Sequence, residues 1–374
     1  MLFYNPVKIH SGENISHEIG SALVSLKTRK VDTILIIAYH SSVLELPQIK
    51  QLQEDFSTEI IIASKSNPTV NDIVVYLKQA RRFSISAVIG IGGGTVLDIA
   101  KTVAYLYSSQ IQSIEDLRTY LADISSDHPK LPWIGVPTTA GTGSEVTCWA
   151  TIWDPGEMKK YSLDTQDNYA YAAFIDPKLQ ITAPMEVAVY SALDALTHAM
   201  EAYWAKQTNM ISKAYALIAM QKIRSSLAVF VKDQTDHTAF NELSDGALFA
   251  GLAFSNTHTA GVHAISYPLT MAFGLPHGLA VSILLPKVWA LNSGHFADET
   301  AMLDALNVDN PAALDQWIAD MLDQLEISNK LQDYGVTNED FQLIKANANT
   351  KGRADNNPAA LSEVAVQTIL ENIY

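Results

Sequence analysis

The chain of 374 residues has one cysteine, Cys148, and far fewer basic than acidic side chains. A single cysteine excludes an intramolecular disulfide framework and is what a reducing compartment permits. The 25 lysines and arginines against 40 aspartates and glutamates give a formal net charge of −15. This charge argues against a nucleic-acid or anionic-membrane partner, because phosphate would be repelled.

Long apolar runs are also absent. No stretch reaches about eighteen apolar residues without a polar or charged break, so a membrane span is not expected. Residues 1–20 carry polar and charged side chains throughout and lack the apolar core of a signal peptide. We therefore expect a cytoplasmic protein with neither membrane nor nucleic-acid partners.

The composition that remains is that of a well-buried globular protein, with 48% hydrophobic and only 17% charged residues. A chain of this length is too long for one ordinary core, so two domains are expected. We expect an α/β domain over residues 1–182 and an all-helical domain over residues 183–374.

The first half alternates buried strands with helices. Residues 33–38 and 59–63 are nearly continuous apolar runs, typical of parallel strands that are buried on both faces. Thr69 and Asp72 resemble a capping pair at the start of a helix over residues 70–80. This repeated alternation predicts a parallel sheet, whereas three- and four-residue apolar spacing after Pro184 predicts helices.

A glycine-rich loop, Gly90-Ile91-Gly92-Gly93-Gly94-Thr95, follows a strand over residues 87–91 and precedes a helix. Glycines let the backbone approach a pyrophosphate, and the helix N-terminus supplies free N–H groups. The loop is not a strict GxGxxG, because Thr95 occupies the last glycine position. A tight strand–helix turn with no ligand is the alternative.

A second loop, from Pro137 to Glu145, is dense in hydroxyls and small residues and follows a strand over residues 131–136. Its hydroxyls and N–H groups could bind phosphate or ribose oxygens, although an ordinary polar turn is the simpler reading in isolation. Two such loops in one α/β domain strengthen each other, because open α/β sheets bind ligands at the carboxyl ends of their strands.

The helical half contains a candidate metal site. Asp194 and His198 are four residues apart, so on a helix they share one face. His263 and His277 flank a largely apolar segment in which buried imidazoles would need partners. One carboxylate and three imidazoles suit Fe²⁺ or Zn²⁺, with a position open for a substrate oxygen. An Asp–x₃–His pair alone is common by chance, so the case depends on all four residues.

In combination, these motifs resemble the iron-containing alcohol dehydrogenase family. The matching stretches run in order over nearly the whole chain: residues 92–101, 137–145, 176–177, 194–203 and 263–278. The resemblance implies the dehydroquinate synthase-like fold, with an N-terminal Rossmann-like α/β domain and an all-α C-terminal domain. It implies a homodimer that transfers hydride between NADP(H) or NAD(H) and an alcohol or aldehyde at a metal.

The resemblance also carries site residues over by position. The family's metal ligands fall on Asp194, His198, His263 and His277. Its dinucleotide contacts fall on Gly92, Gly93, Gly94, Thr95, Thr138, Thr139 and Thr142. Asp98 and Lys160 match positions that line the nicotinamide end of the cleft, and Ser41 is a further candidate for cofactor contact.

Three positions depart from the family pattern. Thr95 replaces a serine but keeps the hydroxyl, and Ala192 replaces a glycine. Tyr267 stands where many members have a histidine cast as a proton relay, so that relay is in doubt. A phenol can donate a hydrogen bond to an aldehyde oxygen but is a poorer base at neutral pH.

The segment from His263 to Thr270, together with residues 150–154, 160–163 and Trp204, resembles the phosphonoacetaldehyde reductase branch. This similarity suggests reduction of phosphonoacetaldehyde to 2-hydroxyethylphosphonate, although no arginine cluster for the phosphonate is evident. The alternatives are a zinc-dependent glycerol or polyol dehydrogenase, a dehydroquinate synthase-like cyclase, and an inactive nucleotide-binding scaffold.

The end of the first long strand bears on the choice of nicotinamide. A carboxylate there would bind the adenosine ribose and repel a 2′-phosphate. The sequence Ala38-Tyr39-His40-Ser41-Ser42 has none, which favours NADPH over NADH.

Overall fold

A computed structural model describes residues 3–26, 33–65, 67–125, 128–157, 159–348 and 352–374. The chain forms two compact units. The α/β unit comprises residues 5–139 and 144–182, and the helical unit comprises Phe3, Tyr4 and residues 140–143 and 183–374. The sequence did not indicate that the short segment 140–143 belongs with the helices.

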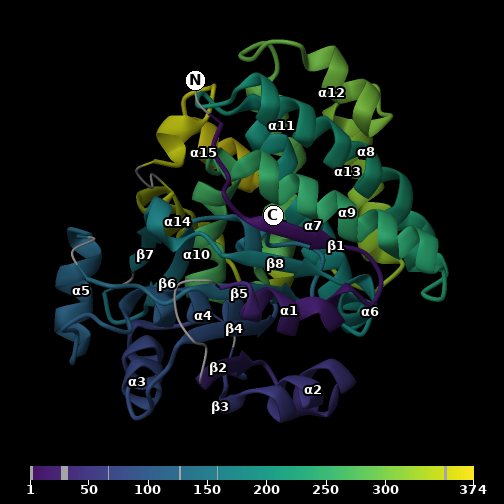
Figure 1. The fold of residues 1–374 in the computed structure, drawn as a ribbon. Helices are drawn as coiled ribbons and strands as arrows, with labels where there is room; N and C mark the ends of the chain where they lie inside the picture. Colours follow the sequence, from purple (N-terminus) through teal and green to yellow (C-terminus); the bar gives the residue numbers. More distant parts are fainter. Residues whose placement is uncertain (1–2, 27–32, 66, 126–127, 158, 349–351) are drawn as a thin grey trace. The chain divides into compact units, whose positions relative to one another are not determined.

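The α/β unit is built on a six-stranded parallel sheet in the order β1-β8-β5-β4-β2-β3 (Figure 1). A separate antiparallel pair is formed by β6 and β7. The strands are β1 (Lys8–Ser11), β2 (Thr33–Ala38), β3 (Ser57–Ile62), β4 (Ala87–Gly92), β5 (Trp133–Pro137), β6 (Trp149–Asp154), β7 (Lys159–Asp164) and β8 (Ala172–Ile175). The Rossmann-like parallel sheet that the alternation predicts is thus confirmed.

The α-helices of this unit are α1 (Ile19–Val24), α2 (Pro47–Asp55), α3 (Val70–Ala80), α4 (Gly94–Leu106), α5 (Ile114–Ala122) and the single turn α6 (Pro177–Gln180). Helices α1 and α2 pack on one face of the six-stranded sheet, and α4 packs on the other. Helix α3 begins with the predicted capping box, in which Thr69 and Asp72 each accept from the other's backbone N–H.

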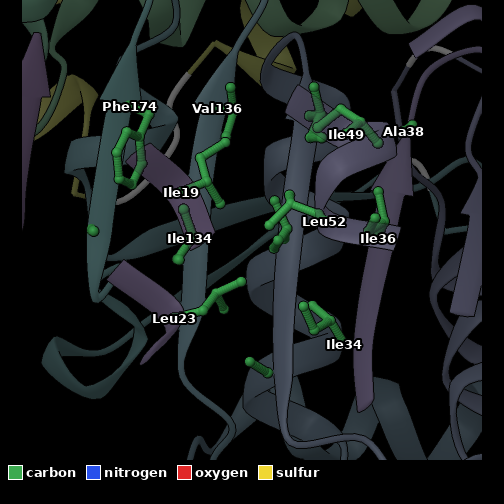
Figure 2. Close-up of a cluster of buried hydrophobic side chains, with 14 of the residues drawn as sticks. Ile19, Leu23, Ile34, Ile36, Ala38, Ile49, Leu52, Ile134, Val136 and Phe174 are labelled. Carbon is green, nitrogen blue, oxygen red and sulfur yellow. The ribbon is translucent and has the colours of Figure 1, made fainter. Parts of the chain in front are cut away.

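One core of the α/β unit lies between the sheet and helices α1 and α2. Figure 2 shows Ile19 and Leu23 of α1 and Ile49 and Leu52 of α2 packed over strand residues such as Ile36. Side chains of a strand alternate between faces. In β4, Ala87, Ile89 and Ile91 therefore join this core, whereas Val88, Gly90 and Gly92 face α4.

The strand order places a topological switch point between β2 and β4. From β2 the chain moves outward to β3 and then back across β2 to β4. Open α/β sheets bind ligands beyond the carboxyl ends of the strands at such a point. The loop after β4 is the glycine-rich loop, and the turn after β2 contains Ser41.

The helical unit contains nine α-helices within the described residues. They are α7 (Met185–Trp204), α8 (Met210–Lys232), α9 (His237–Phe254), α10 (Gly261–Phe273), α11 (His277–Asn292), α12 (Glu299–Leu306), α13 (Pro311–Asp323), α14 (Phe341–Asn347) and α15 (Glu363–Glu371). Helix α7 packs against α8, α9 and α11. Segment 140–143 joins this unit because Gly141 lies against Ser191 of α7 and Gly143 against Gly251 of α9.

Helix α8 is long and apolar enough to cross a membrane, judged by length and composition alone. It packs against α7 and α9, as a core helix would. Core helices of globular proteins satisfy the same two criteria, so α8 is weak evidence for a membrane span.

Candidate metal centre and cofactor loop

Helix α7 supplies the first two candidate ligands. Its C-terminal two-thirds is buried on every side, from Ala192 to Trp204. Within it, Asp194 and His198 lie one turn apart, and the His198 Nε2 atom is 3.6 Å from Asp194 Oδ1. A carboxylate in such apolar surroundings is costly unless it meets positive charge or a metal ion.

The other two candidates approach the same oxygen from α10 and α11. Nε2 of His263 lies 3.5 Å from Asp194 Oδ1, and Nε2 of His277 lies 3.8 Å from it. Ligand atoms of Asp194, His263 and His277 all lie within 4.8 Å of one another. The structure therefore gathers the four predicted side chains around one carboxylate oxygen.

The atoms that converge fit a metal ion better than a hydrogen-bond network. Asp194 Oδ1 and His263 Nε2 are fully buried and make no hydrogen bond. Zinc–nitrogen and zinc–oxygen bonds of about 2.1 Å in a tetrahedron put neighbouring ligand atoms about 3.4 Å apart. The distances of 3.5, 3.6 and 3.8 Å are close to that separation.

Charge and exposure at the centre agree with this reading. Burial alone would raise the pKa of the Asp194 carboxyl, but His198, His263 and His277 hold it well below its ordinary value. The imidazoles therefore favour the ionised carboxylate, which is the form that binds a cation. The side chain of His277 is 31% exposed, against 7% for His198, so the group is open to solvent at His277.

Glu201 is a participant that the sequence did not single out. It lies on α7 and is 0% exposed, and its Oε2 is 2.7 Å from Nδ1 of His263. Metal-bound imidazoles commonly donate their other N–H to a carboxylate in this way. Burial would lower the pKa of His263, but Glu201 and Asp194 raise it, so a metal ion bound at Nε2 would replace the proton that this atom carries without metal. The signal available was an acidic residue in an otherwise apolar stretch, one turn after His198.

Aromatic rings surround the imidazoles. The ring of His198 stacks on Phe254 at 4.1 Å between centroids and lies 4.7 Å from the ring of His263. Tyr267, one turn after His263 on α10, is buried, and its ring stacks with that of His277 at 6.1 Å. Tyr267 thus lies beside two of the candidate ligands.

The glycine loop of the α/β unit is shaped by close packing. A Cβ on Gly92 would lie 2.6 Å from the Cβ of Val96, and one on Gly90 would lie 2.7 Å from that of Ala100. These glycines let α4 begin directly against β4. No side chain caps the start of α4 at Gly94, so its first N–H groups can receive a phosphate.

The loop after β5 lies next to the glycine loop after β4. The N–H of Thr138 donates to the Gly92 carbonyl at 3.0 Å, and Thr139 lies next to Gly93. Thr95 opens α4, and its hydroxyl accepts from the Asn67 N–H. Gly92, Gly93, Gly94, Thr95, Thr138 and Thr139 are therefore brought together at the carboxyl edge of the sheet, and Ser41 follows β2 at the same edge. Thr142 belongs to the helical unit.

Asp98 and Lys101 face the segment after this loop rather than open space. Asp98 accepts from the Ser144 hydroxyl at 2.7 Å and from the Thr151 N–H at 2.9 Å. Burial raises the pKa of Asp98, while Lys101 and, more weakly, Lys160 oppose that rise. Asp98 thus has a clear structural role beside the predicted one at the cofactor, and Lys160 lies near it.

Lys101 is fully buried and donates to three backbone carbonyls. The acceptors are Ser144 at 2.7 Å, Thr147 at 3.0 Å and Trp149 at 2.8 Å. Asp98 and Lys101 therefore tie the chain between β5 and β6 to α4.

Comparisons with known proteins agree with this geometry. Residues 6–177 match the family model described as iron-containing alcohol dehydrogenase, and residues 188–374 match the C-terminal model of that family. The chain is 28% identical over 381 residues to an NAD-dependent methanol dehydrogenase of Bacillus methanolicus, covering 99% of each chain. It is 26% identical to a sulfoacetaldehyde reductase of Bilophila wadsworthia, covering 98% of this chain and 97% of that protein.

Solved structures give the same fold. A crystal structure of 1,3-propanediol oxidoreductase superposes with a TM-score of 0.89 at 24% identity, covering 100% of both chains. The predicted enzyme class, a metal-dependent oxidoreductase that uses a nicotinamide dinucleotide, is confirmed at the level of the family. With both halves matched by its models, the chain belongs to the iron-containing alcohol dehydrogenase family.

Proposed function

We propose that this alcohol dehydrogenase reduces a small anionic aldehyde, with phosphonoacetaldehyde as the candidate substrate and 2-hydroxyethylphosphonate as the product. The observation that carries the catalytic part is the convergence of three imidazole Nε2 atoms on Asp194 Oδ1 at 3.5 to 3.8 Å. Asp194, His198, His263 and His277 would hold Fe²⁺ or Zn²⁺. Such an ion supplies a Lewis acid that polarises a carbonyl oxygen.

Other residues of the chain would bind the cofactor, exclude water and donate the proton. The loops after β4 and β5 would hold a nicotinamide dinucleotide, which would supply hydride chemistry at the carbonyl carbon. The buried rings beside His198 exclude water from that side of the metal centre. Tyr267, whose ring stacks with that of His277, is the candidate proton donor to the aldehyde oxygen, with water and a ribose hydroxyl as the other sources.

Two lines support the substrate class. The segment from His263 to Thr270 resembles the phosphonoacetaldehyde reductase branch. A relative that covers nearly the whole chain is named sulfoacetaldehyde reductase, and sulfoacetaldehyde is likewise a two-carbon aldehyde with a tetrahedral anionic group. We further propose that the enzyme works in the cytoplasm as a homodimer. A zinc-dependent glycerol or polyol dehydrogenase is the alternative, because it would share the two-domain layout, but the set of three histidines and one aspartate fits the iron-type enzymes better.

An aldehyde and alcohol panel tests this proposal. Protein freed of metal by chelator is reloaded with Fe²⁺ or Zn²⁺, and nicotinamide absorbance is followed with phosphonoacetaldehyde, sulfoacetaldehyde, propanal and glycerol. We expect the phosphonate to give the highest kcat/KM. A higher value for propanal would overturn the substrate, and a higher value for glycerol would favour the polyol dehydrogenase.

The metal assignment has its own test. His263→Ala should lose bound metal and turnover together, whereas His237→Ala, on the distant start of α9, should keep both. Full activity of His263→Ala after dialysis against chelator would overturn the metal site.

A further inference from the structure

The side chain of Glu201 is surrounded by donors only. Its Oε1 accepts from the backbone N–H groups of Val262 at 2.6 Å and His263 at 3.4 Å. Its Oε2 accepts from the backbone N–H of Ala260 at 2.7 Å and faces Nδ1 of the His263 ring at 2.7 Å. One buried carboxylate thus contacts both the first turn of α10 and the ring that α10 carries.

These contacts fix His263 in two respects. The amide contacts place a negative charge at the N-terminus of α10, where the helix dipole favours it, and so hold the backbone of His263. The ring contact requires a proton on Nδ1, because a carboxylate can only accept. The lone pair of a neutral ring is then on Nε2, the atom that faces Asp194 Oδ1 at 3.5 Å.

We propose that Glu201 is a positioning residue for the metal centre: it sets the tautomer and the orientation of His263, and so the metal affinity of the site. The proposal rests on the metal-binding function proposed above. It assigns to Glu201 no contact with metal or substrate.

The donor set explains why this position needs a carboxylate. A glutamine has one oxygen and one NH₂ group. If its oxygen accepts from the His263 ring and from the Ala260 N–H, its NH₂ group faces the N–H of Val262, so two donors are opposed. In the reverse orientation, the NH₂ group faces Nδ1 and drives the ring proton to Nε2, which removes the lone pair that a metal needs. Both arrangements weaken the site.

The test compares Glu201→Gln with Glu186→Gln, the same chemical change at an exposed position on the same helix. Zn²⁺ affinity of the metal-free proteins is measured by competition with a chromophoric chelator, and the thermal midpoint is measured without metal. We expect Glu201→Gln to bind Zn²⁺ 10- to 100-fold more weakly, as loss of such an outer partner does in other sites. Glu186→Gln should match the parent protein.

A double-mutant cycle separates positioning from general stability. In a His263→Ala background, with the Zn²⁺ titration extended to millimolar, Glu201→Gln should change affinity by less than about threefold, because the ring it acts through is gone. An equal loss with and without the ring would overturn the proposal. If Glu201→Gln does not fold, Glu201→Asp takes its place, and its Zn²⁺ affinity is again compared with and without the His263 ring. Aspartate keeps the charge, but its shorter side chain cannot reach all four donors.

The two proposals fail differently. A parent protein that binds no Zn²⁺ would overturn the metal-binding function itself. A parent that binds Zn²⁺ tightly, with unchanged affinity in Glu201→Gln, would overturn only the role given to Glu201.

Discussion

A Cβ atom on Gly278 would lie 2.2 Å from the carbonyl oxygen of Tyr190. Gly278 directly follows His277 at the start of α11, and Tyr190 is on α7 one turn before Asp194. The absence of a side chain at this position therefore lets the two ligand-bearing helices approach each other. Backbone atoms on the α7 side cannot move out of the way as a flexible side chain could.

Gly278→Ala should accordingly push α11 away from α7 at His277. We expect destabilisation by about 1–3 kcal/mol, the usual cost of overpacking, and a lower metal content measured on the desalted protein. Gly20→Ala is the control, because a Cβ there has an ordinary 3.7 Å contact with Leu52. Equal metal content in Gly278→Ala and the parent would show that this close approach does not set the position of His277.

Lys101 supports a prediction about the α/β unit. Lys101→Met would fill similar space but remove the buried ammonium group that donates to the carbonyls of Ser144 and Trp149. We expect a loss of about 1–3 kcal/mol in the free energy of unfolding, the range for removing one partner of a buried hydrogen bond, measured by urea unfolding. Lys159→Met, at an exposed position, should stay within about 0.5 kcal/mol of the parent. Similar losses in both variants would contradict the role of Lys101.

Glu145 should make stability depend on pH. Burial raises the pKa of its carboxyl to about 7, and its Oε2 makes no hydrogen bond. The folded pKa is above the unfolded value, so between about pH 4.5 and 7 the folded state binds more protons than the unfolded state. The contribution of Glu145 to the free energy of unfolding is therefore greatest below about pH 4.5, and it is lost as the pH rises to about 7.

Glu145→Gln removes this titration. We expect the variant to be more stable than the parent by about 1–3 kcal/mol at pH 8 and nearly equal to it at pH 4.5, by urea unfolding of metal-free protein. Glu157→Gln, at an exposed position, should show no such gain at pH 8. A parent and a Glu145→Gln variant with parallel pH profiles would contradict the buried, protonated state.

Sequence patterns predicted the elements whose signals are local. The strand over residues 33–38 was predicted with its observed bounds, and the Thr69–Asp72 capping box was found where the pattern placed it. The four candidate ligands were identifiable in combination: an i, i+4 Asp–His pair is common by itself, but here it occurs together with two histidines in apolar surroundings.

Features set by tertiary contacts were not predictable in this way. The β6–β7 pair was missed, and half of it reads Lys159-Lys160-Tyr161-Ser162-Leu163-Asp164, with polar residues on most positions. The membership of segment 140–143 in the helical unit depends on contacts of Gly141 with Ser191, which is 50 residues away in the chain. Glu201 stood out only as an acidic residue in an apolar stretch, and its contacts were not predictable because its partners, residues 260–263, lie about 60 residues later.

The turn after β2 carries the prediction about the nicotinamide. Tyr39 follows the last residue of β2, at the carboxyl edge of the sheet beside the switch point. A carboxylate at such a position binds the 2′-hydroxyl of NADH and repels the 2′-phosphate of NADPH. Because Tyr39, His40 and Ser41 supply none, we expect a higher kcat/KM with NADPH than with NADH.

Tyr39→Asp should reverse this preference, by lowering kcat/KM for NADPH at least about tenfold relative to NADH, since the added charge acts on the 2′-phosphate alone. Ser57→Asp is the matched control, because it adds the same charge at the opposite, amino end of β3. Initial rates with both nicotinamides decide the matter. A parent enzyme that already prefers NADH strongly would contradict the argument from the missing carboxylate, and an equal shift in Ser57→Asp would attribute the change to net charge instead of position.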